Sequence, residues 1–323
     1  MLARVGTDID TAVSLLQQGE VVAIPTETVY GLAGNACEPD ALLKIFEAKN
    51  RPHFNPLIAH TNQLDKVQEF LAPIPDIAYS LAESFWPGPM TLLLKKNDQL
   101  PDLLTAGNPR VAIRVPAHPL ALDLLTQLDF PLAAPSANPF GYISPTTAAH
   151  VAAQLGARIP YILDGGPCTI GIESTILGFS EEGQVIVYRI GGLALEQVEK
   201  IVGKLSILSH SGRNQPKSPG MLNSHYAPTT SLYLGDVQEL LAEYGTEGTG
   251  ILSFSRLIPD LPGIVQRCLA PSGQMEEAAK NLFAVMRELD RLGLKRILAE
   301  KVPEHGVGKA INDRLSRAQE KMK

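Results

Sequence analysis

The feature that most constrains this chain is a break in its sequence pattern between Ser206 and Pro228. In this segment the periodic spacing of apolar residues disappears, while Ser, Gly, Asn and Pro accumulate. Such a composition is typical of a linker or a functional loop, and a segment of this kind is uncommon inside one compact domain. The break therefore predicts two domains, 1–205 and 229–323, joined by a linker or lid at 206–228.

The first 205 residues alternate between short apolar runs and helical patterns, which favours an α/β sheet domain. The expected strands are 21–24, 57–59, 91–94, 111–115, 132–134, 161–163 and 185–189. The expected helices are one from about Ile9, with Asp8 as N-cap and Gly19 as C-cap, and then 41–48, 147–155 and 195–202. The pattern predicts a twisted open sheet covered by helices.

The last 95 residues repeat this alternation on a smaller scale. Strands are expected at 231–234, 250–254, 264–269 and 296–299, and helices at about 237–244, 275–292 and 310–321. Strands separated by helices favour a mostly parallel sheet, so we expect a smaller Rossmann-like α/β domain.

Composition excludes several classes of protein. No apolar run approaches the roughly 20 residues that cross a bilayer, and Asp8 and Asp10 rule out an ordinary signal peptide. Cys37, Cys168 and Cys268 are too widely spaced for a disulfide framework or a zinc site, which favours a cytoplasmic protein. The net charge of −6 disfavours broad electrostatic capture of nucleic acid, although a local basic patch remains open.

The common catalytic fingerprints are missing from the sequence. There is no GxxxxGK[ST] loop, no GxGxxG after a strand and no GxSxG elbow. The seven histidines do not combine with Cys or Glu at zinc spacing, so no protein-bound metal site is expected.

Polar residues follow several predicted strands, where ligands of open α/β sheets bind. Thr28 follows the first strand, His60 the second, and Ser136 and Asn138 the run around Ala134. Hydroxyls and amides at such places can orient a ligand by hydrogen bonds. The alternative is that they form turns and caps, or in the case of His60 simply pack.

Two pairs of cations stand out. Lys49 and Arg51 end a helical pattern and can hold a polyphosphate, although basic residues also favour a helix C-terminus for reasons of the helix dipole. Arg110 and Arg114 lie four apart on a strand and therefore on one face. They need anionic partners, either a ligand carboxylate and phosphate or acidic residues of the chain.

Seven ordered motifs together resemble the YrdC family of threonylcarbamoyl-AMP synthases, in its long two-domain form. They are PTETVYGL, KNRPHFNPLIAH, FWPGPMTLLL, RVAIRVP, PLAAPSAN, GIESTI and SPGM…HYAP. The resemblance implies a nucleotidyltransferase that joins L-threonine, bicarbonate or CO2, and ATP into threonylcarbamoyl-adenylate with release of pyrophosphate. Mg²⁺ would accompany the ATP. The product would serve modification of the adenosine next to the anticodon of certain tRNAs, through a downstream tRNA threonylcarbamoyl transferase machinery, with tRNA itself a further candidate partner.

The resemblance also assigns residues to two subsites. The threonine side comprises Thr28, His60, Arg114, the backbone around Ala134, and Ser174. The nucleotide side comprises Lys49, Arg51, Asn55, Arg110, Ser136, Asn138, Ser144 and Arg189, with Tyr226 of the linker as part of a lid. Lys49 and Arg51 are expected to be the catalytic charges. Residues 222–224, Leu-Asn-Ser, depart from the basic and aromatic residues that the family often has between SPGM and HYAP.

Two other functions compete with the synthase. One is an RNA-binding module without catalysis, and the other is a different carbamoyl-type transferase or hydrolase on the same scaffold. The synthase chemistry needs no covalent protein nucleophile, because the amine of threonine attacks CO2 and the resulting carbamate attacks the α-phosphorus of ATP. Positioning and positive charge would supply most of the rate.

Overall fold

The computed structural model describes residues 2–208, 218 and 225–319. The chain divides into two compact units, each of which is described by itself. The first comprises Met1–Phe140, Pro145–Thr169 and Glu173–Met221, and the second comprises Gly141–Ser144, Ile170–Ile172 and Leu222–Lys323. Two short segments from the first part of the sequence thus belong to the second unit, which the sequence pattern did not indicate.

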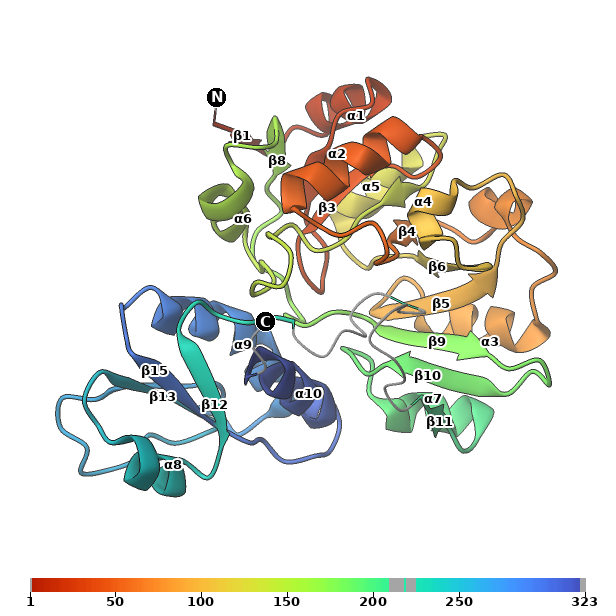
Figure 1. Cartoon of the computed structure of the whole chain (residues 1–323). Coiled ribbons are helices and arrows are strands. Elements are labelled where there is room, and N and C mark those ends of the chain that lie inside the picture. Colours follow the sequence, from red (N-terminus) through yellow and green to blue (C-terminus); the bar gives the residue numbers. More distant parts are fainter. Residues whose placement is uncertain (1, 209–217, 219–224, 320–323) are drawn as a thin grey trace. The chain divides into compact units, whose positions relative to one another are not determined.

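A mixed sheet forms the centre of the first unit (Figure 1). Among the described residues its order is β1-β8-β2-β3-β7-β4-β6-β5-β9-β10-β11. The strands are β1 (Arg4–Gly6), β2 (Val22–Ile24), β3 (Gly31–Asn35), β4 (Ile58–His60), β5 (Met90–Lys95), β6 (Arg110–Arg114), β7 (Leu132–Ala133), β8 (Tyr161–Leu163), β9 (Thr175–Phe179), β10 (Val185–Arg189) and β11 (Ser206–Ile207).

Helices cover both faces of this sheet. They are α1 (Ile9–Gln17), α2 (Pro39–Lys49), η1 (Asp65–Phe70), α3 (Asp76–Phe85), α4 (Asp102–Thr105), α5 (Pro119–Thr126), α6 (Ala148–Leu155) and α7 (Leu195–Val202). The largest apolar cluster joins α2 and α3 to one face of the central strands through residues such as Phe46, Leu81, Leu92 and Ile113. A second cluster packs α1 and α5 on the opposite face, over β2 and β7.

Over the neighbouring strands β4, β6 and β5, the opposite face of the sheet carries polar side chains. Successive side chains of a strand point to opposite faces, so Ala59, Ile113 and Leu92 enter the large core while their neighbours face away from it. Those neighbours are His60, Arg114 and Thr91. His60 pairs with Arg114 in the ladder, and the pairing of Leu92 with Ile113 places Thr91 opposite Arg114. Three polar side chains therefore share one patch of the sheet.

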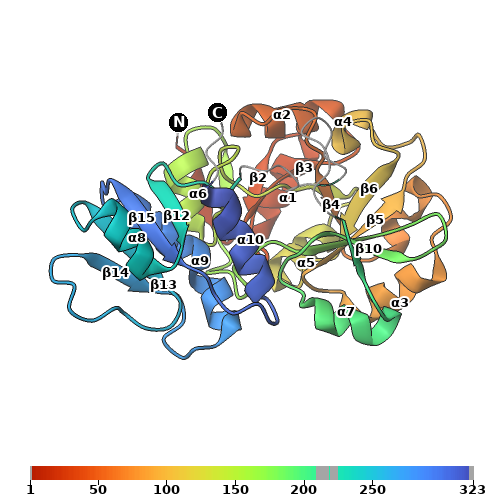
Figure 2. The ribbon, with the colours of Figure 1, turned by 60° about the horizontal axis from the view of Figure 1, so that its bottom comes forward.

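The second unit contains a parallel sheet in the order β12-β15-β13-β14. Its strands are β12 (Ser231–Gly235), β13 (Thr249–Ser253), β14 (Val265–Cys268) and β15 (Arg296–Glu300). Its helices are α8 (Val237–Tyr244), α9 (Met275–Asp290) and α10 (Gly308–Gln319). Figures 1 and 2 show α8 on one side of this sheet and the pair α9 and α10 on the other.

Buried polar contacts hold the segment Gly141–Ser144 within the second unit. The guanidinium of Arg287, 1% exposed, donates to the carbonyls of Ile143 and Ser144. The hydroxyl of Tyr142 donates to Asp290 Oδ2 at 2.6 Å. Burial lowers the pKa of Arg287 to about 10, so this side chain still carries its charge at neutral pH.

The expected α/β class and the parallel second sheet are confirmed, and most expected elements are present within two residues of the predicted bounds. The sequence pattern missed β1, β3, β9 and the helices α3, α4 and α5. Ser206 and Ile207, at the start of the expected linker, form a strand that pairs with β10. The rest of the expected linker from 209 to 224 lies outside the described residues, apart from Ser218.

The predicted N-cap of the first helix is confirmed, whereas its C-cap differs from the prediction. Asp8 is the N-cap of α1, yet its carboxylate accepts a hydrogen bond from the Thr11 hydroxyl and makes no side-chain cap bond to the helix backbone. The helix ends at Gln18 as C-cap, with Gly19 following in the left-handed region at φ 72°. In the described residues, no helix has both the length and the apolar character needed to cross a bilayer.

Candidate active site

A buried ion pair ties the β2–β3 loop to the polar patch of the sheet. Arg114, at the end of β6, donates from Nη2 to Glu27 Oε1 at 2.6 Å and from Nη1 to Thr28 Oγ1 at 2.8 Å. Its Nε donates to the carbonyl of Gly88 at 3.3 Å. A guanidinium has five N–H donors, so these three bonds leave one donor on each Nη for a ligand. Glu27 Oε2 is buried and has no hydrogen-bond partner among the described residues.

His60 lies beside Arg114 on the adjacent strand and is 2% exposed. Burial and the nearby Arg114 charge lower the pKa of His60 to about 3, although hydrogen bonds to the backbone act in the opposite direction. Its Nδ1 lies 3.2 Å from the carbonyl of Ile58. The imidazole is therefore neutral at physiological pH, which suits hydrogen bonding to an uncharged hydroxyl.

Ser174 forms a second polar group at the start of β9. Its hydroxyl lies 2.7 Å from Thr91 Oγ1. Arg189, at the end of β10, donates to Ser174 Oγ at 3.1 Å and to the Ser174 carbonyl at 3.0 Å. Since Thr91 lies opposite Arg114 in the sheet, this group adjoins the ion pair.

Lys49 provides a cation at the end of α2, where it is 1% exposed. Its ammonium donates to the carbonyls of Ser136 and Asn138. Among the described residues no carboxylate pairs with it. Burial lowers the pKa of the Lys49 ammonium well below its ordinary value, and the charge of Arg51 lowers it further.

Arg51 and Asn55 lie in the loop that follows α2. The Arg51 guanidinium donates to the carbonyls of Asn55 and Pro56 at 3.2 and 2.8 Å, which holds this loop in a tight turn. The Asn55 side chain is completely buried, yet neither its amide nitrogen nor its amide oxygen has a partner in the described part of the chain. A buried amide without partners costs about 1–3 kcal/mol per group, so a bound ligand is the natural explanation for Asn55.

Backbone contacts join these groups into one region. The amide of Ala137 donates to the carbonyl of Tyr30 at 2.7 Å, and Ser136 forms an isolated antiparallel bridge with Gly31. The segment that receives the Lys49 ammonium therefore lies next to the loop that carries Thr28. The structure thus brings Lys49, Ser136, Thr28, Arg114 and Ser174 together through a continuous series of contacts.

Ala134 and Arg110 lie at the margins of this region. The amide of Ala134 donates to Ile58, and a Cβ added to Gly31 would meet the Ala134 Cβ at 3.1 Å, so the chain approaches closely here. Arg110 is at the other end of β6 from Arg114, where it contacts Glu181 and the Tyr188 hydroxyl, both at 3.3 Å. Its observed partners are those of a structural salt bridge.

Ser144 and Tyr226 belong to the second unit and are described only within it. Ser144 is fully buried. The Tyr226 ring, 1% exposed, stacks on Phe283 at 5.6 Å between centroids, and the Arg314 guanidinium lies 5.1 Å from its centroid. The expected roles of Ser144 and Tyr226 toward a nucleotide stay predictions.

Sequence reasoning missed two residues of the region. Glu27 fixes Arg114, and Thr91 fixes Ser174. The signal for Glu27 was an acidic residue inside the otherwise apolar and hydroxyl-rich segment PTETVYGL, and the signal for Thr91 was a hydroxyl at the start of a leucine-rich strand. Neither partner could be identified, because both contacts join residues more than 80 positions apart.

The assembled groups suit a small zwitterion beside a polyanion. Arg114 and Glu27 form a buried ion pair with no net charge. This pair offers hydrogen-bond donors to a carboxylate and an acceptor to an ammonium. Lys49, and Arg51 two positions further along the chain, add positive charge to this region. Among the described residues, no group of three or more His, Cys, Asp or Glu could hold a metal ion.

Two family models match the chain in succession. The first, Sua5/YciO/YrdC with the description Telomere recombination, matches residues 14–191. The second is described as the C-terminal domain of threonylcarbamoyl-AMP synthase and matches residues 193–319.

Similar proteins cover nearly the whole chain. The threonylcarbamoyl-AMP synthase of Pyrococcus abyssi is 40% identical over 96% of this chain and 93% of its own. That of Bacillus subtilis is 42% identical over 96% of this chain and 92% of its own. The crystal structure of the P. abyssi Sua5 protein with L-threonine superposes with a TM-score of 0.89 at 39% identity, covering 96% of this chain and 94% of that one.

The fold and the curated relatives define an enzyme of the nucleotidyltransferase type, as the sequence motifs predicted. The chain belongs to the Sua5/YciO/YrdC family, in the long form that carries the additional C-terminal domain of threonylcarbamoyl-AMP synthases.

The shifted pKa of His60 predicts a measurable pH dependence of stability. The folded chain keeps His60 neutral down to about pH 3, whereas the unfolded chain protonates it near pH 6.5. Stability is therefore lost as the pH falls through this window. Between pH 7 and pH 5, the free energy of unfolding of the native chain, measured in urea, should fall by about 2 kcal/mol more than that of the His60→Asn variant. Equal losses in both proteins would mean that His60 is not buried in its neutral form.

The Arg114–Glu27 pair predicts strong coupling in a double-mutant cycle. Arg114→Met should destabilise the chain by about 3–5 kcal/mol, because it leaves the Glu27 charge buried and unpaired. Adding Glu27→Gln should recover a large part of that loss, since no uncompensated charge remains. Chemical denaturation of the four proteins measures the coupling, and simple additivity would contradict the pair.

Proposed function

We propose that this enzyme makes L-threonylcarbamoyl-adenylate from L-threonine, bicarbonate or CO2, and ATP, and releases pyrophosphate. The observation that most supports this proposal is the buried Lys49 ammonium, which has no carboxylate partner in the described residues and lies beside Ser136 and Asn138. A buried cation held only by carbonyls is stabilised when an anionic ligand binds beside it.

In this proposal threonine binds over the polar patch of the sheet. Its carboxylate accepts hydrogen bonds from the two N–H groups of Arg114 that are not used in the bonds to Glu27 and Thr28. Its hydroxyl bonds to neutral His60 or to Ser174, and the small residue Ala134 leaves room for the ligand next to the backbone. The unpartnered Glu27 Oε2 accepts from the ammonium.

ATP binds on the side of Lys49. The polar residues of the first unit proposed to hold it are Lys49, Arg51, Asn55, Ser136, Asn138 and Arg189. The Asn55 amide supplies both a donor and an acceptor that are now without partners, which suits a ligand that offers both. Lys49 and Arg51 carry the charge that stabilises the phosphates during transfer.

The chemistry proceeds in two steps. The ammonium of threonine first loses a proton to solvent, and the nitrogen lone pair then attacks the carbon of CO2, so that an N–C bond forms while one C=O π bond opens onto oxygen. The nitrogen of this adduct loses a second proton to solvent, which leaves the carbamate. A carbamate oxygen next attacks the α-phosphorus, and the bond from that phosphorus to the bridging oxygen breaks to release pyrophosphate. A histidine with a pKa near 3 is a poor base, so His60 orients the substrate and does not abstract the proton.

Mg²⁺ enters as part of the substrate MgATP. Because the described residues contain no cluster of acidic or histidine ligands, the phosphate oxygens and water would hold the ion. The chain's own contribution is then to bind and orient the phosphates that carry it.

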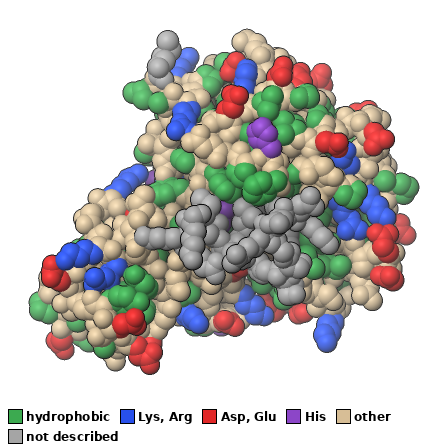
Figure 3. Space-filling model, in the orientation of Figure 1, with side chains coloured by type: hydrophobic (Ala, Val, Ile, Leu, Met, Phe, Trp, Pro, Cys, Tyr) green, Lys and Arg blue, Asp and Glu red, His purple; other side chains and the backbone are tan. Residues whose placement is uncertain are grey.

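We further propose that the adenylate is handed to the machinery that threonylcarbamoylates the adenosine next to the anticodon of tRNA, in the cytoplasm. Direct capture of tRNA by a broad basic surface is disfavoured by the net charge of −6. On the face drawn in Figure 3, Lys and Arg are interspersed with Asp and Glu.

Substrate dependence tests the reaction. The purified chain is mixed with ATP and Mg²⁺, with and without bicarbonate and with each of threonine, serine and valine, and pyrophosphate is followed. We expect release that requires both threonine and bicarbonate. Release that is indifferent to threonine would reject the synthase and favour another transferase or hydrolase.

Replacement of Lys49 tests the phosphate role. Lys49→Met keeps the aliphatic stem and removes the charge, so turnover should fall by about 100-fold or more. The matched control is Lys44→Met on the same helix, where the lost contact is a half-exposed ion pair with Glu20. Thermal unfolding of both variants checks that they fold. Turnover of Lys49→Met close to that of the control would contradict the assignment.

A further inference from the structure

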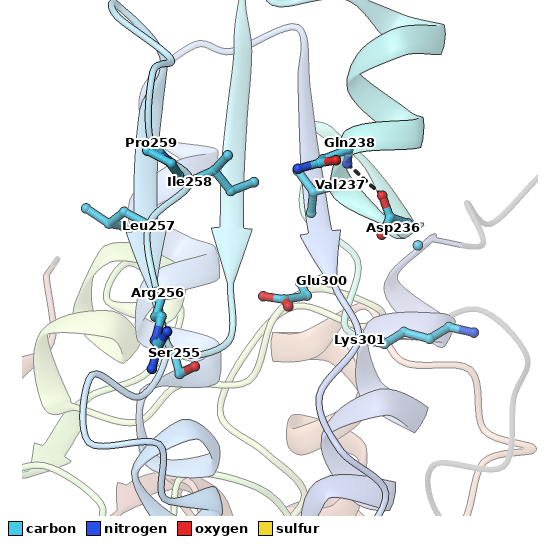
Figure 4. Close-up of a pocket in the computed structure, with 11 residues that line it drawn as sticks. Asp236, Val237, Gln238, Ser255, Arg256, Leu257, Ile258, Pro259, Glu300 and Lys301 are labelled. Carbon is cyan, nitrogen blue, oxygen red and sulfur yellow. Dashed lines mark hydrogen bonds between the residues drawn. The ribbon is translucent and has the colours of Figure 1, made fainter.

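The second unit contains a cavity of about 780 Å³ that the reaction above does not use. It lies at the carboxyl ends of three parallel strands, where Asp236 follows β12, Ser255 follows β13 and Glu300 ends β15 (Figure 4). This volume is within the range of about 300–1,000 Å³ typical of sites for small molecules.

The topology of the sheet explains why a crevice opens here. β12 and β15 are neighbours, and their chains leave in opposite directions: α8 follows β12 on one face, while α10 follows β15 on the other. At such a switch point the two loops diverge, and open α/β sheets bind ligands in the gap. The cavity is therefore at the position where this fold class places ligands.

Hydrogen bonds fix the walls of the cavity without any ligand. Asp236 Oδ1 accepts from the amides of Gln238 and Glu239, and Glu300 Oε2 accepts from the amide of Phe254 at 2.7 Å. The Gln266 side chain bonds both the amide and the carbonyl of Ile258, at 2.8 and 3.0 Å. A preformed wall lowers the entropic cost of binding.

The charges of the lining divide into two kinds. Each of the two carboxylates, Asp236 and Glu300, accepts backbone N–H hydrogen bonds on one oxygen. The other oxygen of each can accept from a ligand hydroxyl. Arg256 and Lys301 form no ion pair with any described residue. Figure 4 shows Arg256 next to Ser255 on one side of Glu300 and Lys301 on the other. Arg256 with the Ser255 hydroxyl suits a phosphate.

Apolar and polar side chains border the upper part of the cavity. Ile258 and Gln238 point toward one another across it, with Val237 below Gln238 (Figure 4). Leu257, on the same loop as Ile258, is 57% exposed. An apolar side chain that faces an amide suits a planar ring that also carries hydrogen-bonding edges.

We propose that this cavity is a second ligand site, which takes a nucleoside monophosphate. The base lies between Ile258 and Gln238, the sugar hydroxyls donate to Glu300, and the phosphate contacts Arg256 and Ser255. The phosphate does not sit at the start of α8, because the Asp236 carboxylate already occupies that helix end and would repel it. This proposal is independent of the reaction proposed for the first unit.

Equilibrium dialysis with AMP as the probe tests the site in the full-length chain carrying Lys49→Met, which weakens nucleotide binding in the first unit. We expect that adding Arg256→Ala lowers the number of AMP molecules bound per chain by one at a concentration that saturates the parent. Lys301→Ala should weaken binding several-fold less than Arg256→Ala. Arg291→Ala, which removes a cation outside the cavity, should leave the count unchanged.

Three results would overturn the proposal. The first is an AMP count that is the same with and without Arg256→Ala, and the second is equal loss in the Arg291→Ala control. The third is binding of inorganic phosphate as tight as that of AMP, since Ile258 and Gln238 would then contribute nothing. Pyrophosphate release in the synthase assay is a separate readout, so failure of one proposal leaves the other standing.

Discussion

The buried pair between Arg114 and Glu27 holds the candidate site together. Arg114 is fixed on a central strand, and its bonds to Glu27 and Thr28 attach the loop after β2 to that strand. The same loop carries Tyr30, which receives the amide of Ala137 and so positions the segment that binds Lys49. One buried ion pair thus connects the strand of Arg114, through this loop, to the segment whose carbonyls receive the Lys49 ammonium.

The same pair bears on the proposed binding of a zwitterion beside a polyanion. Because Glu27 compensates the charge of Arg114, the pair would attract a carboxylate without drawing in phosphate as strongly as a lone cation would. Lys49 has no carboxylate partner in the described residues, and a polyanion bound beside it would raise its lowered pKa and so stabilise its charged form. In the proposed reaction, electrostatics would therefore favour threonine near Arg114 and the phosphates near Lys49.

The sequence predicted the fold class and much of the site because both follow from local rules. The period of two placed Arg110 and Arg114 on one face, and loops after strands pointed to Thr28, Ser136 and His60. The sequence could not identify the partners of these arginines, because Arg114 pairs with a residue 87 positions away and Arg110 pairs with the turn residue Glu181. Lys49 was expected at a helix end, and only the packed structure reveals that it is buried there with no carboxylate partner in the described part of the chain.

The most direct test of the account is a crystal structure of the chain with L-threonine and a non-hydrolysable ATP analogue bound together. The account predicts the threonine carboxylate within hydrogen-bonding distance of Arg114, and the phosphates within reach of Lys49 in the same region of the first unit. Threonine bound away from Arg114, or phosphates bound away from Lys49, would contradict it.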